Sequence, residues 1–245
     1  MPEHELWITA LFNKYLAGVA SGVLSMAGVH AEHADKPWAN YVVMQILVAF
    51  IVIVVFAILR PRLSMDRPGR MQHTFEIVYH FLGGQAHEVV GHSGRKYLHL
   101  FTTIFLFILF ANLIGIVPTL ESPTMFAPVP LGCALVTFAY YNLMGFKEQG
   151  VGGYLKHFAG PMPLLAPLMI PIEMISHLGR MLSLTVRLYA NMFAGEQVTL
   201  VFLGLVPFGV PAAFMGLHVF VSFLQAFVFA LLTMIYVSGA VSHEH

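Results

Sequence analysis

The sequence predicts an all-α membrane protein with about five transmembrane helices and one interfacial amphipathic helix, the last two spans forming a long, strongly tilted hairpin. Hydrophobic residues make up 58% of the 245-residue chain and charged residues only 10%, whereas about a quarter of a soluble domain is charged. Apolar runs long enough to cross a bilayer recur along the chain. We therefore expect a single polytopic domain over 1–245, with an external N-terminal segment at 1–37 and a helical bundle at 38–245.

The first half of the chain contains three predicted spans and the amphipathic helix. Residues 41–59 are apolar apart from Gln45, and the run ends at an Arg-Pro-Arg sequence. Residues 71–90 mix histidines and a glutamate with large apolar residues, which is typical of a helix lying at the membrane interface. A second span at 97–117 contains Asn112, and a third occupies 131–146 after a proline-rich loop that carries Glu121. Prolines mark that loop as a break between helices.

Basic residues predict the orientation. The loop between the second and third spans has no lysine or arginine. Cytoplasmic loops carry the excess of basic residues, so we expect the N-terminus outside and the C-terminus in the cytoplasm. The basic residues lie between the first two spans and after the third: Arg60, Arg62, Arg67, Arg70, Arg95, Lys96, Lys147 and Lys156.

The second half predicts two long helices. A glycine- and proline-rich break at 150–171 leads into a helical stretch over about 164–203, and a last helix follows Pro207 and Pro211 and ends near Val241. Forty helical residues extend roughly 60 Å, about twice the hydrocarbon thickness of a bilayer. The helix must therefore tilt, kink or run partly horizontally. Its long flank is suited to docking another membrane protein.

One arginine in this long helix is the strongest functional signal. Arg187 lies in an otherwise apolar stretch, and a guanidinium at bilayer depth costs from about 3 to more than 10 kcal/mol. Because arginine stays charged, it must face a cavity, a protein interior or a carboxylate. A structural ion pair with Glu196 or Glu173 is one alternative. The other is a negative group supplied by a partner.

Polar residues follow one face of the same helix at intervals of three or four. Glu196 points nearly to the opposite side, nine residues beyond Arg187. Arg180 is open to two interpretations, a role in conduction or a side chain that reaches toward lipid headgroups. The residues of the stripe are Glu173, Ser176, Arg180, Ser183, Arg187 and Asn191.

These positions predict ion conduction by two disconnected half-paths. On the last helix His218, Ser222 and Gln225 share a face, and an antiparallel hairpin brings His218 toward Glu196. These two groups form the outer half-path, while Glu173, His177 and Ser176 form the inner one. Arg187 repels a hydronium between them and lowers the pKa of a carboxylate brought beside it. The mobile carboxylate itself is missing from this chain.

Each of these polar residues could instead have a purely structural role. Glu196 and His218 could form a buried hydrogen-bonded pair, and Asn191 and Gln225 could join neighbouring helices through their amides. The spacing His87 to His92 is one residue too long for an H-E-x-x-H zinc motif. A repeat of histidines every seven residues, His73, His80 and His87, suits zinc or the polar face of the interfacial helix. We expect no metal and no cofactor.

Two runs, 171–177 (Pro-Ile-Glu-Met-Ile-Ser-His) and 182–196 (Leu-Ser-Leu-Thr-Val-Arg-Leu-Tyr-Ala-Asn-Met-Phe-Ala-Gly-Glu), closely resemble subunit a of the F-type ATP synthase membrane sector. Shorter motifs around Asn112, at 122–124, at 140–148 and around Gln225 support the resemblance. It covers the chain from about Trp38 onward, and the first thirty-odd residues match less clearly. Many family members have glycine where this chain has Ala190, and alanine is small enough to keep the close approach.

The resemblance implies that the missing carboxylate belongs to a rotating ring of c subunits, with Arg187 as the stator charge that faces it. It places Glu196, His218, Gln225 and Asn191 in or beside the ion path, and Glu173 toward the cytoplasmic exit. It also implies b-type peripheral stalk subunits as partners, the F1 sector indirectly, and the bacterial inner membrane as the location. The chain would be a non-catalytic part of a proton-transporting ATP synthase, coupling ion flow to ATP synthesis.

Other function classes remain as alternatives. A self-contained secondary transporter or ion channel would use Arg187 to bind an anionic substrate, although the chain has no convincing internal repeat of the transporter kind. An intramembrane hydrolase would need a nucleophile or metal constellation that the sequence does not show. No Walker-type glycine loop is present, and a net charge of zero gives no reason to expect a nucleic-acid partner.

Overall fold

The computed structural model describes residues 5–26, 37–65, 68–117, 119–159, 166–205 and 209–241. All regular structure in these ranges is helical, as predicted. The predicted tail at 242–245, together with Arg67, Pro118 and Pro207, lies outside the described residues. The α-helices are α1 (Trp7–Met26), α2 (Asn40–Leu59), α3 (Arg70–Val90), α4 (Gly94–Leu113), α5 (Pro128–Ala159), α6 (Ala166–Leu205) and α7 (Val210–Val241).

Four segments of the described chain are long and apolar enough to cross a membrane: Asn40–Arg62, Arg70–Ile116, Pro128–Gly150 and Val210–Val241. The chain is therefore a multi-pass membrane protein, and the predicted positions of its first, second, third and last spans are confirmed. The remaining long helix is α6, which carries the charges of the polar stripe and packs beside α7. The predicted amphipathic helix is α3, and it precedes α4 within one of the four segments.

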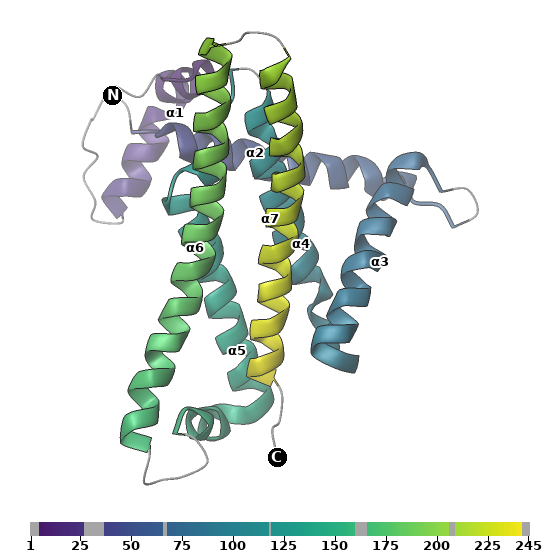
Figure 1. Ribbon diagram of the computed structural model, residues 1–245, viewed down its shortest axis with the longest axis vertical. Coiled ribbons are helices and arrows are strands. Elements are labelled where there is room, and N and C mark those ends of the chain that lie inside the picture. Colours follow the sequence, from purple (N-terminus) through teal and green to yellow (C-terminus); the bar gives the residue numbers. More distant parts are fainter. Residues whose placement is uncertain are drawn as a thin grey trace.

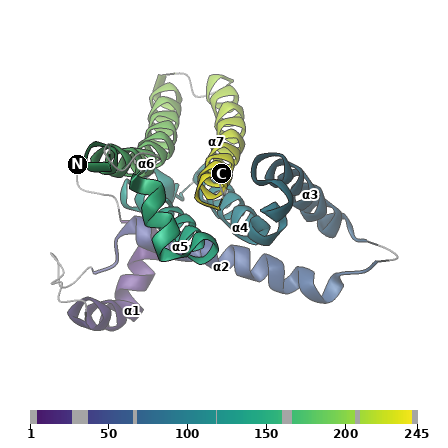
Figure 2. The same ribbon diagram turned by 90° about the horizontal axis from the view of Figure 1, so that it is seen from below.

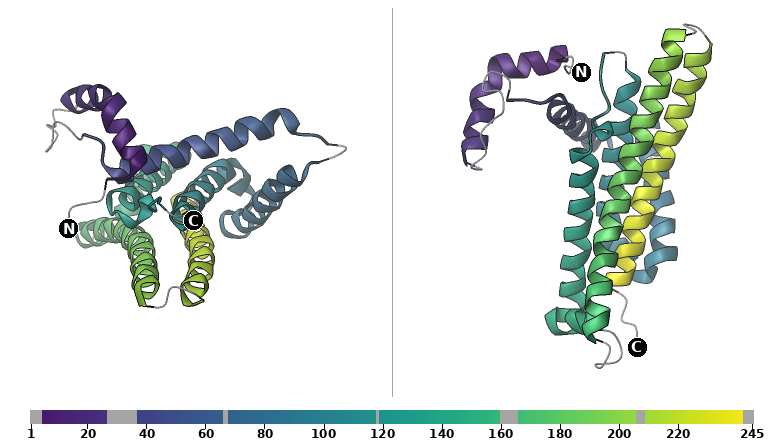
Figure 3. Two further views of the ribbon diagram at one scale, coloured as in Figure 1. Left: turned by 90° about the horizontal axis from the view of Figure 1, so that it is seen from above. Right: turned by 60° about the vertical axis from the view of Figure 1, so that its left-hand side comes forward.

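Helices α6 and α7 form an antiparallel hairpin along the longest axis of the molecule, and α5 and α4 run alongside it (Figure 1). Helix α2 lies across this bundle rather than along it, as the views from below and above show (Figures 2 and 3). A 20-residue helix such as α2 is roughly 30 Å long, which matches the hydrocarbon thickness when it stands upright.

The main core lies where α4, α5, α6 and α7 meet. Its large side chains are fully buried, and small residues such as Ala226 and Ala230 allow α7 to approach α4 closely. Close packing of this kind holds helices together in lipid, where burial of apolar surface gives little advantage. The largest buried side chains of this core include Phe101, Phe105, Tyr141, Leu188, Met192, Phe229 and Met234.

One boundary differs from the prediction. The break expected from residue 150 is only a kink at Gly150, whose φ of 71° places it in the left-handed region, and helix resumes up to Ala159. Glycine adopts this conformation without a Cβ penalty, so it can bend the chain without ending the helix. The helix predicted at about 164–203 is α6, and it contains Pro171.

Helix α1 belongs to the N-terminal segment for which the sequence predicted no element. It is fixed to the start of α2 through polar contacts around Trp38. The Asn13 side chain accepts a hydrogen bond from the Trp38 backbone N–H (3.0 Å), and the Trp38 indole donates to the Leu16 carbonyl (2.9 Å). The Phe12 and Trp38 rings pack edge to face. Aromatic packing and hydrogen bonds thus attach α1 at the end of the bundle.

Candidate functional site

Arg187 lies in the middle of α6, on the flank of the helix beside the core positions Leu184 and Leu188. Its side chain is exposed, and its guanidinium donates one long hydrogen bond to Ser183 Oγ (3.4 Å). Among the described residues it forms no ion pair, so the alternative of a structural pair with Glu173 or Glu196 is not realised. An unneutralised charge on an apolar helix needs water or a partner carboxylate beside it.

Polar contacts join α6 to α7 above this arginine. Asn191 Nδ2 donates a hydrogen bond to Gln225 Oε1 (2.8 Å), and Gln225 is buried. One turn further along α6, Gly195 makes room for His218: a Cβ added there would lie 3.3 Å from the His218 Nδ1. The sequence therefore correctly placed His218 beside the end of α6, and the missing side chain of Gly195 is what allows the approach.

Glu196 comes next in the chain. No hydrogen bond joins Glu196 to His218 in the described structure. Its Oε2 atom is buried and has no hydrogen-bond partner among the described residues. Glu121, from the loop after α4, lies close enough to interact with it electrostatically. A buried carboxyl oxygen without a partner is costly unless a proton or a water molecule satisfies it, which is the behaviour expected of a group on an ion path.

A buried polar cluster continues from His218 toward that loop. His218 Nε2 lies 3.3 Å from the Asn112 carbonyl oxygen, and the Asn112 side chain accepts a hydrogen bond from Thr124 (2.6 Å). The hydroxyls of Ser122 and Thr124 are 2.8 Å apart, and Ser122 also donates to the Ala111 carbonyl. Sequence reasoning did not assign Ser122 and Thr124 to the site. Their signal was the Ser-Pro-Thr motif beside Asn112 in the resemblance.

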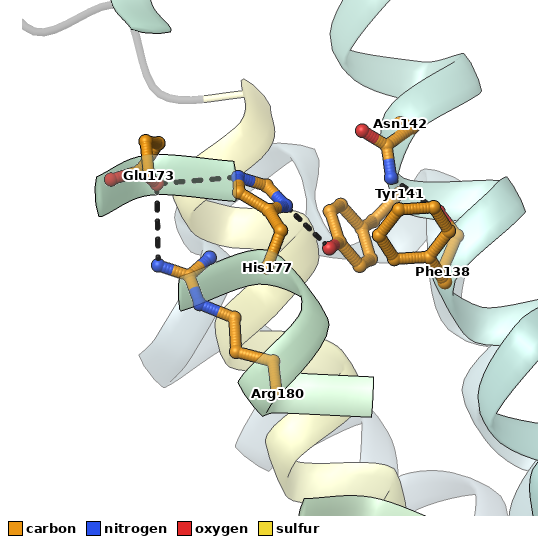
Figure 4. A network of polar contacts seen from close by, with 6 residues as sticks. All are labelled: Phe138, Tyr141, Asn142, Glu173, His177 and Arg180. Atoms are coloured by element: carbon orange, nitrogen blue, oxygen red, sulfur yellow. Dashed lines mark hydrogen bonds and ion pairs between the residues drawn. The ribbon is translucent and has the colours of Figure 1, made fainter. Parts of the chain in front are cut away.

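A second polar network occupies the other end of α6 (Figure 4). Glu173 Oε1 lies 3.2 Å from His177 Nε2 and 3.7 Å from the Arg180 guanidinium. His177 is buried, and its Nδ1 lies 2.6 Å from the Tyr141 hydroxyl of α5. Tyr141 was quoted in the sequence motifs but not named as a site residue. Ser176 shares this end of the helix but stands outside the network.

Arg187 lies between the two groups along the helix. Glu173 and Glu196 are 23 positions apart on α6, which corresponds to roughly 35 Å of helix axis. The polar groups near Glu196 and His218 form one region, and those around Glu173 and His177 form the other. Titratable side chains and hydroxyls can relay protons within each region, and the amides can hydrogen-bond to them. The fixed cation lies in the interval that separates them.

Comparison with known proteins agrees with the resemblance seen in the sequence. The family model described as ATP synthase A chain matches residues 42–238. A protein called ATP synthase subunit a from Solibacter usitatus (strain Ellin6076) is 63% identical over 235 residues, covering 96% of this chain and all of the relative. Its counterpart from Koribacter versatilis (strain Ellin345) is 48% identical over 99% of both chains, and that from Sulfurihydrogenibium sp. (strain YO3AOP1) is 43% identical over 84% of this chain and 99% of the relative. The chain belongs to the ATP synthase A chain family, which contains the subunit a of ATP synthases.

Proposed function

We propose that this chain is the stator subunit of an F-type ATP synthase membrane sector and that it provides two half-channels through which protons reach and leave a rotating c-ring. The observation that carries the proposal is Arg187: an exposed charge with no acidic partner in the described chain, lying between two polar regions of one long helix. The carboxylate that this charge requires is then supplied by the ring.

The outer half-channel comprises Glu196 and His218, with Asn191 and Gln225 lining it. The buried hydroxyls of Ser122 and Thr124 extend the polar path from His218 toward the loop after α4. Asn112 joins the two parts, since its carbonyl faces His218 and its side chain bonds Thr124. A proton entering on this side is passed between groups that can both accept and donate it.

The inner half-channel comprises Glu173 and His177, with Ser176 on the same side. Tyr141 holds His177 through its hydroxyl, and Arg180 holds the Glu173 carboxylate. A ring carboxylate that arrives beside Arg187 is stabilised as an anion and releases its proton. Because Arg187 repels a hydronium, protons cannot pass directly between the half-channels. Each proton must instead travel around with the ring, driven by about 2.3 kcal/mol per charge per 100 mV of membrane potential.

In this proposal the chain makes and breaks no covalent bond, and ATP is made and hydrolysed by partner subunits. Its membrane partners are the c-ring and b-type peripheral stalk subunits, and it is linked to the F1 sector through them. The basic residues between the first two spans support an N-terminus outside and a C-terminus in the cytoplasm. The relatives come from bacteria, which supports the bacterial inner membrane as its location.

The test is ATP-driven proton pumping into membrane vesicles that contain the whole complex. Arg187→Ala should abolish pumping while the complex still assembles, and Glu196→Gln should reduce it strongly. Lys147→Ala is the matched control, because this exposed lysine lies on α5 outside both polar regions. Undiminished pumping by Arg187→Ala would contradict the proposal. Substrate transport by the chain reconstituted alone would favour a self-contained transporter instead.

A further inference from the structure

A polar hollow outside both half-channels lies where α3 turns into α4. These two helices run side by side and are joined by a short 3-10 turn at Gly91–Ser93 (Figure 1). The hollow has a volume of about 770 Å³, a size suited to a small ligand or to part of a larger one. It is lined by Tyr79, His80, Gly83, Gly84, His87, His92, Arg95 and Leu98.

The lining of this hollow carries several hydrogen-bond donors and no carboxylate. Arg95 supplies a fixed positive charge and forms no ion pair with any described acid. The His87 and His92 rings are 5.2 Å apart and nearly perpendicular. No group of three possible metal ligands occurs among the described residues. A guanidinium with neighbouring imidazole and phenol donors is instead the chemistry that binds a phosphate group.

The backbone holds these donors in place. Gly91 adopts a φ of 78° at the reversal, and a Cβ added to Gly94 would lie 2.4 Å from the Ala86 carbonyl oxygen. The start of α4 therefore packs directly against α3, which fixes Arg95 and His92 relative to His87. The N-terminus of α4 also lies at this wall, and its dipole favours a negative group. Above Gly84 the space is open, since nothing lies within 4 Å of an added Cβ.

A second, mostly apolar hollow of about 170 Å³ has Tyr79 in its lining in common with the first. It lies between α2, α3 and α4, and its apolar lining comes from all three helices. Gln72 and Glu76 also line it and are hydrogen-bonded to each other. A ligand that places an anionic group in the first hollow and an apolar group in the second is an amphiphile. The remaining lining residues are Phe56, Leu59, Leu63, Phe75, Val78, Thr102 and Leu106.

We propose that the two hollows together bind one anionic phospholipid. Its phosphate lies against Arg95 and the imidazoles of His87 and His92, and one acyl chain enters the apolar hollow past Tyr79. Helix α3 has the mixed polar and apolar composition of an interfacial helix, so the phosphate would lie at headgroup depth. The site would attach α3 to the surface of the bundle through a lipid. This assignment does not depend on the proposed half-channels.

The test measures binding of phosphatidylglycerol to the purified whole complex by native mass spectrometry during a lipid titration. Arg95→Gln should weaken binding at this site about tenfold, because a charge-assisted hydrogen bond is lost. Gly84→Phe should abolish it by filling the hollow, and it should not weaken the helix, since glycine is the poorer helix former. Lys147→Gln removes an equal charge elsewhere and should leave binding unchanged. Unaltered binding in both Arg95→Gln and Gly84→Phe would overturn the proposal.

A second arm separates the lipid from free phosphate, which shares the same chemistry. Inorganic phosphate and water-soluble glycerophosphate should fail to displace phosphatidylglycerol at millimolar concentration, because they cannot occupy the apolar hollow. Leu106→Gln places a polar group in that hollow and should weaken lipid binding while the complex remains assembled. Equal binding of glycerophosphate and phosphatidylglycerol would overturn the assignment to a lipid. Preference for phosphatidylglycerol over phosphatidylcholine in vesicles of either lipid would support it.

Discussion

Replacing Tyr141 by phenylalanine removes a single hydroxyl group from the network at the inner end of α6. Tyr141 is 2% exposed and His177 is 8% exposed, and their 2.6 Å hydrogen bond joins α5 to α6. The ring of Tyr141 also stacks on His177 and packs edge to face on Phe138. Phenylalanine keeps both ring contacts, so the change isolates the hydrogen bond.

Loss of a buried hydrogen bond costs about 1–3 kcal/mol, and interhelical hydrogen bonds within membranes lie at or below the lower part of that range. We therefore expect Tyr141→Phe to lower the free energy of unfolding by about 1–2 kcal/mol, a factor of about 5–30 in the equilibrium constant. The assay is reversible unfolding of the purified chain in mixed micelles, driven by increasing SDS and followed by circular dichroism.

Tyr140→Phe is the matched control for this measurement. Tyr140 is the neighbouring residue on α5, is half-buried, and packs edge to face on Tyr97. Its hydroxyl forms no hydrogen bond with the described residues, so its removal should leave the unfolding midpoint unchanged. Equal midpoints for the two variants would refute the reasoning, because they would show that the bond to His177 adds nothing to stability. If Tyr141→Phe also pumps protons as well as the native chain, the hydroxyl contributes to stability and is not needed for conduction.

Other contacts give three further expectations in the same unfolding assay. Gly94→Ala should lower the free energy of unfolding by about 1–3 kcal/mol, because the added Cβ would clash with the Ala86 carbonyl oxygen. Gly84→Ala is the control: its added Cβ has no neighbour within 4 Å, so the variant should be as stable as the native chain or more stable. Thr124→Val keeps the side-chain shape but removes the hydroxyl that bonds Asn112, and a cost of about 1–2 kcal/mol is expected; no measurable cost would show that the cluster around Asn112 is not structural. Asn191→Leu and Gln225→Leu should be non-additive in a double-mutant cycle, with a coupling of about 0.5–1.5 kcal/mol from their 2.8 Å bond, and strict additivity would contradict a direct contact.

Most of the helices could be predicted because membrane spans are long and apolar. The run that became α2 is predicted to within one residue at each end. Glu173 and Arg180 were placed on one face of the long helix, and the structure adds an ion pair between them (3.7 Å) that the sequence did not predict. Helix α1 could not be predicted in the same way, because its attachment depends on Asn13 meeting Trp38, 25 residues away. Local periodicity carries no information about such a contact.

The site was predictable within one helix and much less so between helices. His177 and Glu173 are four residues apart, so helical geometry alone brings them together. The partner of His177 on its other nitrogen is Tyr141 of α5, 36 residues away, and only the packed structure identifies it. Asn191 and Gln225 likewise join neighbouring helices, because their side-chain amides form a hydrogen bond with each other. Their position beside an ion path stays a prediction.

Arg180 and Arg187 lie seven residues apart on the same face of α6, and their surroundings separate the two interpretations that the sequence left open for Arg180. Arg180 has Glu173 at 3.7 Å and the Tyr236 ring at 5.5 Å, whereas Arg187 faces no described acid. Removing Arg180 should therefore cost little stability, below about 1 kcal/mol for a partly exposed pair. It should also change the field at Arg187 only slightly, because seven helical residues, roughly 10 Å, separate the two charges and salt screens them over that distance.

We accordingly expect Arg180→Gln to retain most ATP-driven pumping and Arg187→Gln to retain none, with both complexes assembled to the same level. The two substitutions remove the same charge from the same helix and differ only in whether that charge has a partner. Complete loss of pumping in Arg180→Gln would assign this arginine a direct part in conduction. Retention in both variants would show that neither charge is needed to keep the half-channels apart, because net pumping requires that protons do not leak along α6.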